Sequence, residues 1–346
     1  MKIILAFARL KHESLGDPPL GLAYLAARLR KNLGCSVIVL DMAFLSADEI
    51  ARRLAKEGPD MVGVYVSTPV YNIAMRIISE AKSNGAFVVA GGPHATVAAE
   101  SLQDKADAVV IGEGEEVFSE LARAYAANKC FKEIDGIWFK HNGRIVRNAP
   151  HEFVRDLDTL PHPARDLLDM ERYIDNCQYF DCLDMNMRAP TMIASRGCPF
   201  KCGYCQPTLN KMFGAKIRLR SPDDIIAEIK ELRSRYAVNA VFFHDDTFGF
   251  DKKWLAAFCD KLILEVPRLI WGCNSRADLL DEGSLGIMRK SGLRCLHIGA
   301  ESASQRIIDE IYYKGIRSLD VRQAVAMAGK KDIRTMCFFM LGAPTE

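Results

Sequence analysis

The residues best suited to chemistry are three cysteines in the stretch CPFKCGYC. Cys198, Cys202 and Cys205 are separated by three and by two residues, so one short loop can bring three thiolates together. Thiolates bind zinc and iron–sulfur clusters. A zinc site usually needs a fourth cysteine or histidine, and Cys177 and Cys182 are the nearby candidates. A [4Fe–4S] cluster held by three thiolates leaves one iron open for a small molecule, and the spacing favours that interpretation.

Eight other cysteines are scattered along the chain. We expect most of them to be small buried side chains, because free cysteine behaves as a small hydrophobic residue. The total of 11 cysteines is odd, and the N-terminal apolar stretch lacks a long hydrophobic region and a small-residue cleavage site. These features favour a cytoplasmic protein over an exported one with a disulfide framework.

The composition argues against several classes of protein. The 346 residues carry 46 Lys and Arg against 44 Asp and Glu, a net charge of +2, so binding to nucleic acid through bulk charge is not expected. Hydrophobic residues make up 49% and charged residues 26% of the chain, as in ordinary globular proteins. No run of about 18 apolar residues is present, which argues against a membrane span.

The first half alternates short apolar runs with helical stretches. Strands are expected over residues 2–7, 37–40, 61–67, 87–90 and 108–111, and helices over 20–33, after a cap at Ser46, and over 71–84. Apolar strands separated by helices predict a doubly wound parallel sheet, in which ligands bind at the carboxyl ends of the strands. Three unusual loops follow those ends: Ser67-Thr68-Pro69, GGPHAT from Gly91, and GEGE from Gly112.

A hairpin and a linker follow this sheet. Asn142-Gly143 between two strand-like runs is a strong signal for a hairpin turn. Residues 156–169 contain prolines and lack apolar periodicity, which is typical of a linker. We therefore expect a first domain over residues 1–150, a linker over 151–186 and a second domain over 187–346.

The second half also alternates strands and helices. Strands are expected over residues 191–195, 240–243, 269–273, 295–298 and 335–341, and helices after the cap Ser221-Pro222 and over 253–264. Each strand is followed by polar residues. Barrel enzymes place their catalytic groups on the rim that such residues form. The second domain is therefore expected to be a partial (β/α) barrel.

The cysteine motif resembles the signature of the radical S-adenosylmethionine superfamily, C-x3-C-x-aromatic-C, with Tyr204 in the aromatic position. The N-terminal half resembles the Rossmann-like cobalamin-binding domain that precedes the radical core in one subgroup. Its matching stretches are PPLGLAYLAA at 18–27, GGPHAT at 91–96 and IGEGE at 111–115. The resemblance covers nearly the whole chain and keeps the order of all these loops.

The resemblance implies three cofactors: a [4Fe–4S] cluster, S-adenosylmethionine and cobalamin. The three cysteines would hold the cluster, and S-adenosylmethionine would bind its open iron and be cleaved reductively to a 5′-deoxyadenosyl radical. The residues implied to contact S-adenosylmethionine are Tyr204, Asp245, Asp246, Arg276, Glu301, Ser302 and Gly342. Asp245 and Asp246 would face the amino group, Arg276 the carboxylate, and Glu301 and Ser302 the ribose hydroxyls.

Cobalamin would bind at loops rich in glycine, where the backbone can approach a ligand closely. The implied residues are Leu20, Gly21, Ser67, Thr68, Gly91, Gly92, Pro93, His94, Gly112, Glu113, Gly114 and Glu115. The D-x-H-x-x-G motif, whose histidine binds cobalt in many cobalamin proteins, has no match in this sequence. We expect His94 to form hydrogen bonds in its loop and to leave cobalt without a histidine ligand.

The second domain resembles the family core only in part. That core usually has six strands followed by further helices, whereas this chain provides five and reaches its last residue at Gly342-Ala343-Pro344-Thr345-Glu346. We expect a core truncated after five strands, which is either a fragment or is completed by a partner. The C-terminal region that usually reads the substrate would then be absent.

Three functions remain open at this point. The first is a cobalamin-dependent radical enzyme that methylates an unactivated carbon of a small molecule, with electrons from a donor such as flavodoxin or ferredoxin. The second uses the same cofactors for radical cyclisation or ring rearrangement. The third is a non-catalytic protein that binds cobalamin and an iron–sulfur cluster.

Overall fold

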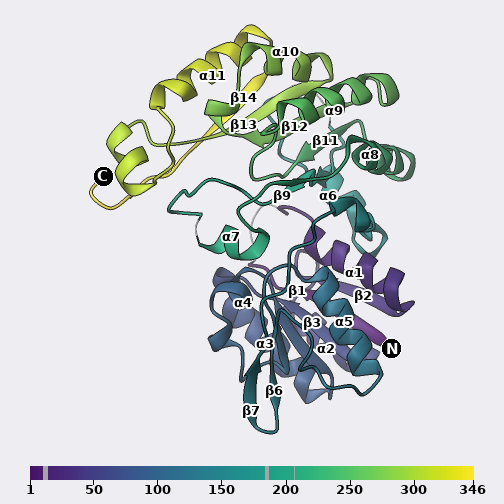
Figure 1. Ribbon diagram of the computed structural model, residues 1–346. Helices are drawn as coiled ribbons and strands as arrows, with labels where there is room; N and C mark the ends of the chain where they lie inside the picture. The colour runs from purple at the N-terminus through teal and green to yellow at the C-terminus, as the bar shows by residue number, and fades with distance from the viewer. Residues whose placement is uncertain (11–14, 184–186, 206) are drawn as a thin grey trace. The chain divides into compact units, whose positions relative to one another are not determined.

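The computed structural model describes residues 1–10, 15–183, 187–205 and 207–346 (Figure 1). The chain forms two compact units. The first contains Met1–Arg155, Thr159–Asp169 and Lys211–Phe213, and the second contains Asp156–Asp158, Met170–Asn210 and Gly214–Glu346. The linker expected over 151–186 contributes residues to both units, and its residues 184–186 lie outside the described residues.

The first unit is built on a seven-stranded sheet with the order β2-β1-β3-β4-β5-β6-β7. Its strands are β1 (Lys2–Phe7), β2 (Ser36–Asp41), β3 (Met61–Tyr65), β4 (Phe87–Gly91), β5 (Ala108–Val110), β6 (Ile137–His141) and β7 (Arg144–Arg147). The first five are parallel, which confirms the expected doubly wound sheet. The hairpin at Asn142-Gly143 forms β6 and β7, which add antiparallel strands beside β5.

Helices cover both faces of this sheet (Figure 1). They are α1 (Leu20–Leu33), α2 (Ala47–Glu57), α3 (Tyr71–Ser83), α4 (Pro93–Val97) and α5 (Glu115–Ala126), with short turns η1 (Thr68–Val70) and η2 (Ala99–Ser101). The capping box is formed at the start of α2, where Glu49 N–H donates to Ser46 Oγ and Ser46 N–H donates to Glu49 Oε2. Each such cap stabilises a helix by about 1 kcal/mol.

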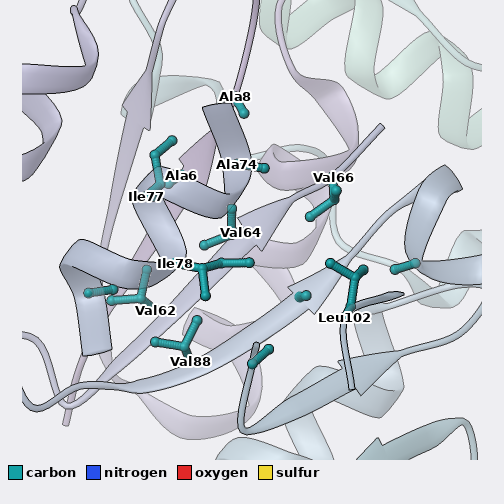
Figure 2. Close-up of a cluster of buried hydrophobic side chains, with 14 of the residues drawn as sticks. Ala6, Ala8, Val62, Val64, Val66, Ala74, Ile77, Ile78, Val88 and Leu102 are labelled. Carbon is teal, nitrogen blue, oxygen red and sulfur yellow. The ribbon is translucent and has the colours of Figure 1, made fainter. Parts of the chain in front are cut away.

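Two buried cores hold the helices on the sheet. Alternate strand residues point to opposite faces, so Val62 and Val64 pack with α2 and α3, as Figure 2 shows in part, while Met61 packs with α1 and α5. Gly63 lies among Leu5 and Phe118, where a Cβ would come within 2.8 Å of the Leu5 side chain. This packing fixes the strands whose carboxyl ends carry the glycine-rich loops.

The second unit is built on a five-stranded, fully parallel sheet with the order β14-β13-β12-β11-β8. Its strands are β8 (Thr191–Met192), β11 (Ala240–Phe243), β12 (Ile270–Ser275), β13 (Leu293–Glu301) and β14 (Arg334–Phe339). The single strand expected over 191–195 is instead β8 and a separate β9 (Ser195–Arg196). β9 pairs antiparallel with β10 (Arg218–Leu219), and this pair directs the chain into the cysteine loop.

The helices that follow residue 169 are α6 (Met170–Asp175), α7 (Thr208–Phe213), α8 (Pro222–Tyr236), α9 (Lys252–Glu265), α10 (Glu282–Lys290) and α11 (Ser318–Lys330). Phe243, Phe258 and Trp271 are fully buried and pack edge to face, which fixes α9 on one face of the sheet. Phe242 points to the opposite face and packs there with Phe180. Among the described residues, no helix combines the length and apolar character that crossing a membrane requires.

Candidate functional site

The three cysteines lie on the loop that follows β9. Cys198 and Cys202 are buried, whereas Cys205 is exposed. Two backbone bonds hold the loop: Cys205 N–H donates to Cys202 O at 3.1 Å, and Gly203 N–H donates to Tyr312 O at 2.7 Å. Partial burial and then the neighbouring charge of Cys202 raise the pKa of the Cys205 thiol to about 11. Two of the three thiols are thus buried on a loop that backbone hydrogen bonds hold in place.

The preference for a cluster over a single metal ion rests on the spacing of the three cysteines along the chain. No group of three or more His, Cys, Asp and Glu side chains in the described part of the chain is close enough together to hold one metal ion. A four-iron cluster binds its thiolates at separate corners and so spaces them more widely. Cys182, a possible fourth zinc ligand, lies with its Sγ 3.4 Å from the Cys295 Sγ.

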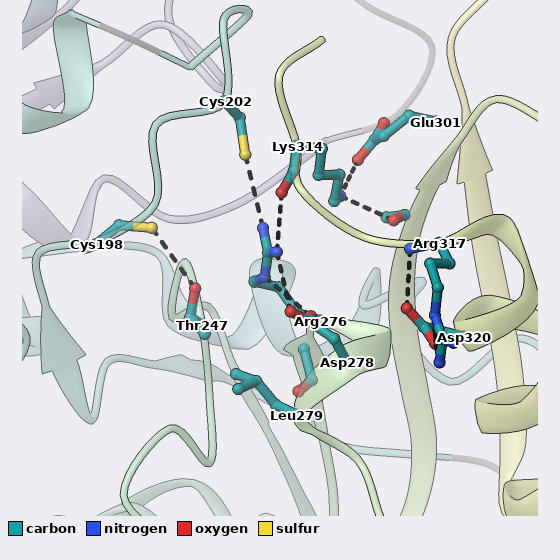
Figure 3. A network of polar contacts seen from close by, with 12 residues as sticks. Cys198, Cys202, Thr247, Arg276, Asp278, Leu279, Glu301, Lys314, Arg317 and Asp320 are labelled. Atoms are coloured by element: carbon teal, nitrogen blue, oxygen red, sulfur yellow. Dashed lines mark hydrogen bonds and ion pairs between the residues drawn. The ribbon is translucent and has the colours of Figure 1, made fainter. Parts of the chain in front are cut away.

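Arg276, at the end of β12, contacts the cysteine loop (Figure 3). Its Nη1 donates to the Cys202 Sγ at 3.6 Å. Its Nε and Nη2 form a fork on the carboxylate of Asp278 at 3.1 Å each, and the guanidinium carbon lies 3.5 Å from the centre of the Phe200 ring. Asp278 occupies the bidentate edge of the Arg276 guanidinium. The pairing of Arg276 with the carboxylate of S-adenosylmethionine therefore stays a prediction.

Tyr204 and Glu301 meet at the end of β13. The Tyr204 hydroxyl donates to Glu301 Oε1 at 2.9 Å, and Lys314 Nζ donates to the same oxygen at 2.5 Å and to Gly299 O at 2.8 Å. Glu301 has a left-handed backbone with φ of 65°, a conformation that costs a non-glycine residue energy. A Cβ on Gly299 would lie 2.3 Å from Glu301 Oε1. Gly299 thus leaves room for this network.

The two aspartates after β11 have different surroundings. Asp245 is fully buried and accepts from Ala194 N–H at 3.0 Å and from the Ser195 hydroxyl. Burial raises the pKa of Asp245 to about 6, although these hydrogen bonds act to lower it. Asp246 is exposed, and partial desolvation followed by the Asp245 charge raises its pKa to about 6 as well. The charge of Asp246 is also among the causes that raise the pKa of Cys205.

The remaining residues implied for S-adenosylmethionine lie at two strand ends. Ser302 is buried, and its Oγ accepts from Ser304 N–H at 3.2 Å. Gly342 follows β14 with φ of 81°, and its N–H donates to Glu346 Oε2 at 2.7 Å. Hydrogen bonds of the second unit thus join Arg276 and Glu301 to the cysteine loop that carries Tyr204, and Asp246 lies at the end of β11. The role of each of these residues toward S-adenosylmethionine stays a prediction.

The residues implied for cobalamin lie at one edge of the first sheet. They follow the carboxyl ends of β1, β3, β4 and β5: Leu20, Gly21, Ser67, Thr68, Gly91, Gly92, Pro93, His94, Gly112, Glu113, Gly114 and Glu115. Gly92 and Gly112 have φ of 106° and 80°. A Cβ on Gly92 would lie 3.0 Å from Val66 O. These two positions require glycine and present bare backbone at this edge.

His94 uses both of its ring nitrogens within the protein. Nδ1 lies 3.0 Å from Thr68 Oγ1 and Nε2 lies 2.9 Å from Ser101 Oγ. The ring also packs against Tyr71 at 4.9 Å between centres. Glu113 is buried, and its Oε2 accepts from Val154 N–H at 2.9 Å. Both side chains therefore form hydrogen bonds that shape the loops, as expected of His94.

Four contributors to the site were missed at the level of sequence: Phe200, Thr247, Asp278 and Lys314. Thr247 is buried, and its Oγ1 lies 3.7 Å from the Cys198 Sγ. Asp278 stands two residues after Arg276, so its spacing could have suggested the fork. Lys314 follows a π-helical turn, Ile307–Ile311, in a stretch without periodicity, and no sequence signal points to it.

Two family descriptions match this chain. Residues 16–122 match the B12 binding domain, and residues 192–346 match the radical SAM superfamily. The first match spans the sheet edge with the glycine-rich loops. The second begins at β8, includes the cysteine loop and extends to the last residue.

Curated relatives share both halves. An uncharacterised methyltransferase of Pyrococcus horikoshii is 33% identical over 334 residues, covering 95% of this chain and 70% of the relative. The anaerobic magnesium-protoporphyrin IX monomethyl ester cyclase of Cereibacter sphaeroides is 28% identical over 344 residues, covering 95% of this chain and 54% of the relative. The chain thus spans about half to two thirds of the length of such relatives.

Solved structures share the fold. The radical S-adenosylmethionine methyltransferase TsrM from Kitasatospora setae, solved with cobalamin and a [4Fe–4S] cluster, matches 100% of this chain and 67% of its own, with a TM-score of 0.80 and 18% identity. The cobalamin-dependent S-adenosylmethionine radical enzyme OxsB, solved with aqua-cobalamin, matches 98% of this chain and 49% of its own, with a TM-score of 0.82 and 18% identity. At this identity the comparison concerns the fold alone.

Proposed function

The chain belongs to the radical S-adenosylmethionine superfamily and carries a B12-binding domain, and from this premise we propose that it methylates an unactivated carbon of a small molecule. The observation that carries the proposal is the cysteine loop with two buried thiols, joined in one chain to a sheet edge of glycine-rich loops. The first can hold a [4Fe–4S] cluster, and the second can accept cobalamin.

When bound, the [4Fe–4S] cluster supplies the electron that cleaves S-adenosylmethionine, and cobalamin carries the methyl group. The chain itself positions these groups. Cys198, Cys202 and Cys205 hold the cluster, and burial of the first two limits water around it. The bonds from Gly203 to Tyr312 and from Tyr204 to Glu301 hold the loop in place.

We assign the two aspartates different roles. The exposed carboxylate of Asp246 follows the carboxyl end of β11 and is suited to accept the ammonium of S-adenosylmethionine. With a pKa of about 6 it is mostly ionised at neutral pH. Asp245 instead binds Ala194 and Ser195, and so positions the entry into the cysteine loop.

The cobalamin site is proposed at the carboxyl edge of β1, β3, β4 and β5. Bare backbone at Gly92 and Gly112 lets a large ring approach closely. His94 is held by Thr68 and Ser101, which supports cobalamin bound without a histidine on cobalt.

A second reaction has its own support. The relative from Cereibacter sphaeroides is a cyclase and covers 95% of this chain at 28% identity, so radical ring formation with the same cofactors is the alternative. Either reaction needs a small-molecule substrate and a one-electron donor such as flavodoxin or ferredoxin. The odd number of cysteines, 11, favours a location in the cytoplasm over an exported protein with a disulfide framework.

Product analysis tests the proposal and separates the two reactions. The protein is reconstituted anaerobically with iron, sulfide and hydroxocobalamin, then given S-adenosylmethionine and dithionite. Methyl transfer predicts S-adenosylhomocysteine together with 5′-deoxyadenosine when a substrate is present. 5′-Deoxyadenosine without S-adenosylhomocysteine would favour the cyclase reaction. Bound zinc without iron, or no cleavage of S-adenosylmethionine, would overturn the proposal.

A further inference from the structure

Two of the three cysteine thiols are in contact with side chains from neighbouring strand ends (Figure 3). Thr247 follows β11 and lies with its Oγ1 3.7 Å from the Cys198 Sγ. Arg276 follows β12 and lies with its Nη1 3.6 Å from the Cys202 Sγ. A thiolate is an acceptor only, so once these cysteines are deprotonated both side chains act as donors to sulfur.

The donor on Cys202 is rigidly held and charged. Arg276 is 6% exposed, and its Nη2 also donates to Lys314 O at 3.0 Å. Asp278 binds its other edge, and Phe200 covers one face of the guanidinium. These contacts leave one edge of a buried positive charge directed at the Cys202 sulfur.

The donor on Cys198 is neutral and equally buried. Thr247 is 3% exposed, and the contact that the structure records for its hydroxyl is the one with the Cys198 Sγ. A buried hydroxyl needs a hydrogen-bond partner. A sulfur that turns more negative on reduction is a better acceptor, so this contact strengthens when an electron arrives.

We propose that Arg276 and Thr247 are positioning residues that raise the reduction potential of the cluster by donating hydrogen bonds to the sulfurs of Cys202 and Cys198. The inference rests on the proposed function, because it requires the cluster to be bound. Hydrogen bonds and positive charge at cluster sulfurs stabilise the reduced, more negative state. Arg276 contributes more than Thr247, since a hydrogen bond from a guanidinium is charge-assisted and that from a hydroxyl is not.

A higher reduction potential would make the cluster easier to reduce by a one-electron donor. The proposed task of Arg276 also differs from binding the carboxylate of S-adenosylmethionine. If Arg276 bound the carboxylate of S-adenosylmethionine instead, replacing Arg276 would weaken the binding of S-adenosylmethionine and leave the reduction potential of the substrate-free cluster unchanged. The two tasks are therefore separable by measuring potential and affinity on the same variants.

The test is a redox titration of the reconstituted, substrate-free protein, followed by the EPR signal of the reduced cluster. Thr247→Val removes the hydroxyl with little change of shape and should shift the potential to a more negative value. Thr247→Ser keeps the hydroxyl and should keep the wild-type potential. Arg276→Gln should give the larger negative shift. The double variant Arg276→Gln/Asp278→Asn removes both charges and provides a folded alternative if the single variant fails to fold.

The outcomes are distinct from those for the proposed function. Full iron loading with unchanged potentials in Thr247→Val and in the Arg276 variants would overturn this inference alone. An unchanged potential with a higher Kd for S-adenosylmethionine in Arg276→Gln would assign that residue to substrate. Failure of the wild type to assemble a [4Fe–4S] cluster would overturn the proposed function itself.

Discussion

The Tyr204 hydroxyl lies 2.9 Å from Glu301 Oε1 and donates a hydrogen bond to it. This bond joins the cysteine loop to the end of β13, 97 residues later in the chain. Lys314 donates to the same carboxylate oxygen, and both charged residues are buried. The local order of the cysteine loop therefore depends on a buried ion pair that belongs to other elements.

Removing one partner of that pair is expected to destabilise the second unit. Lys314→Met leaves the Glu301 carboxylate buried without its cation, at a cost of about 3–5 kcal/mol in the free energy of unfolding. Glu301→Gln/Lys314→Met removes both charges and should recover most of the loss. Denaturant unfolding of the wild type, the two single variants and the double variant measures the coupling. Equal losses in Lys314→Met and in the double variant would contradict the assignment.

Loss of any one of the loop cysteines is expected to abolish cluster assembly. Cys198→Ala, Cys202→Ala and Cys205→Ala each leave two thiolates, which is too few to anchor the cluster. The measurements are iron and sulfide content and the cluster absorbance after reconstitution. Cys337→Ala is the matched control, because Cys337 lies in the same unit on β14 and is expected to leave iron content at the wild-type value. Cluster-dependent cleavage retained by Cys198→Ala would show that the ligand assignment is wrong.

Two glycines at the cobalamin edge are expected to respond in opposite directions to alanine. Gly92 has φ of 106°, and a Cβ there would lie a tight 3.0 Å from Val66 O, so Gly92→Ala should cost about 1–3 kcal/mol in stability. Gly21 lies in α1, and a Cβ added there would have no heavy atom within 4 Å, so Gly21→Ala should gain about 0.5–1 kcal/mol.

Cobalamin retention then separates packing from binding at these glycines. If Gly21 faces the ligand, Gly21→Ala should be more stable than the wild type and still retain less cobalamin after gel filtration. Thermal melting and the cobalamin absorbance of the same samples provide both values. A stabilised Gly21→Ala protein with full retention would remove Gly21 from the binding site.

His94→Gln is expected to keep cobalamin and its spectrum. Both ring nitrogens of His94 are used by Thr68 and Ser101, so the variant loses loop hydrogen bonds and no cobalt ligand. EPR of the Co(II) state should show the same hyperfine pattern in the wild type and the variant. Nitrogen hyperfine splitting that is present in the wild type and lost in His94→Gln would place the imidazole on cobalt.

The elements of the fold could be predicted wherever the sequence shows a regular pattern of apolar residues. The helix expected over 20–33 is α1 (Leu20–Leu33), and the capping box at Ser46 begins α2. The apolar runs of the first half became five parallel strands in the expected class of sheet. The local apolar pattern predicts such elements, because the hydrophobicity of each residue indicates whether its side chain faces a core.

The features that could not be predicted from the sequence depend on contacts between residues far apart in the chain. The pairing of β9 with β10 consists of two residues from each strand, too few to show alternation. The contacts of Thr247 with Cys198 and of Lys314 with Glu301 connect positions 49 and 13 residues apart. Spacing predicted the cysteines as ligands, but it could not identify the side chains that the fold brings against them.

Acid sensitivity of the second unit is expected to depend on His297. This side chain is 4% exposed on β13, among the rings of Tyr179, Phe242 and Phe338. Burial lowers its pKa to about 4, and the charge of His244 adds to that effect. In the unfolded chain its pKa is about 6.5. Between those values the unfolded state binds more protons, so stability is full above about pH 6.5 and falls as the pH drops toward 4.

His297→Phe removes the titrating group and keeps an aromatic ring in an aromatic setting. The wild type should lose on the order of 2–3 kcal/mol more than the variant between about pH 7 and pH 4. Asp245 and Asp246, whose pKa values burial raises to about 6, act in the opposite direction, but equally in both proteins. Melting temperatures of the two proteins across this pH range provide the comparison. Parallel curves would mean that His297 is protonated in the folded protein as readily as in the unfolded chain.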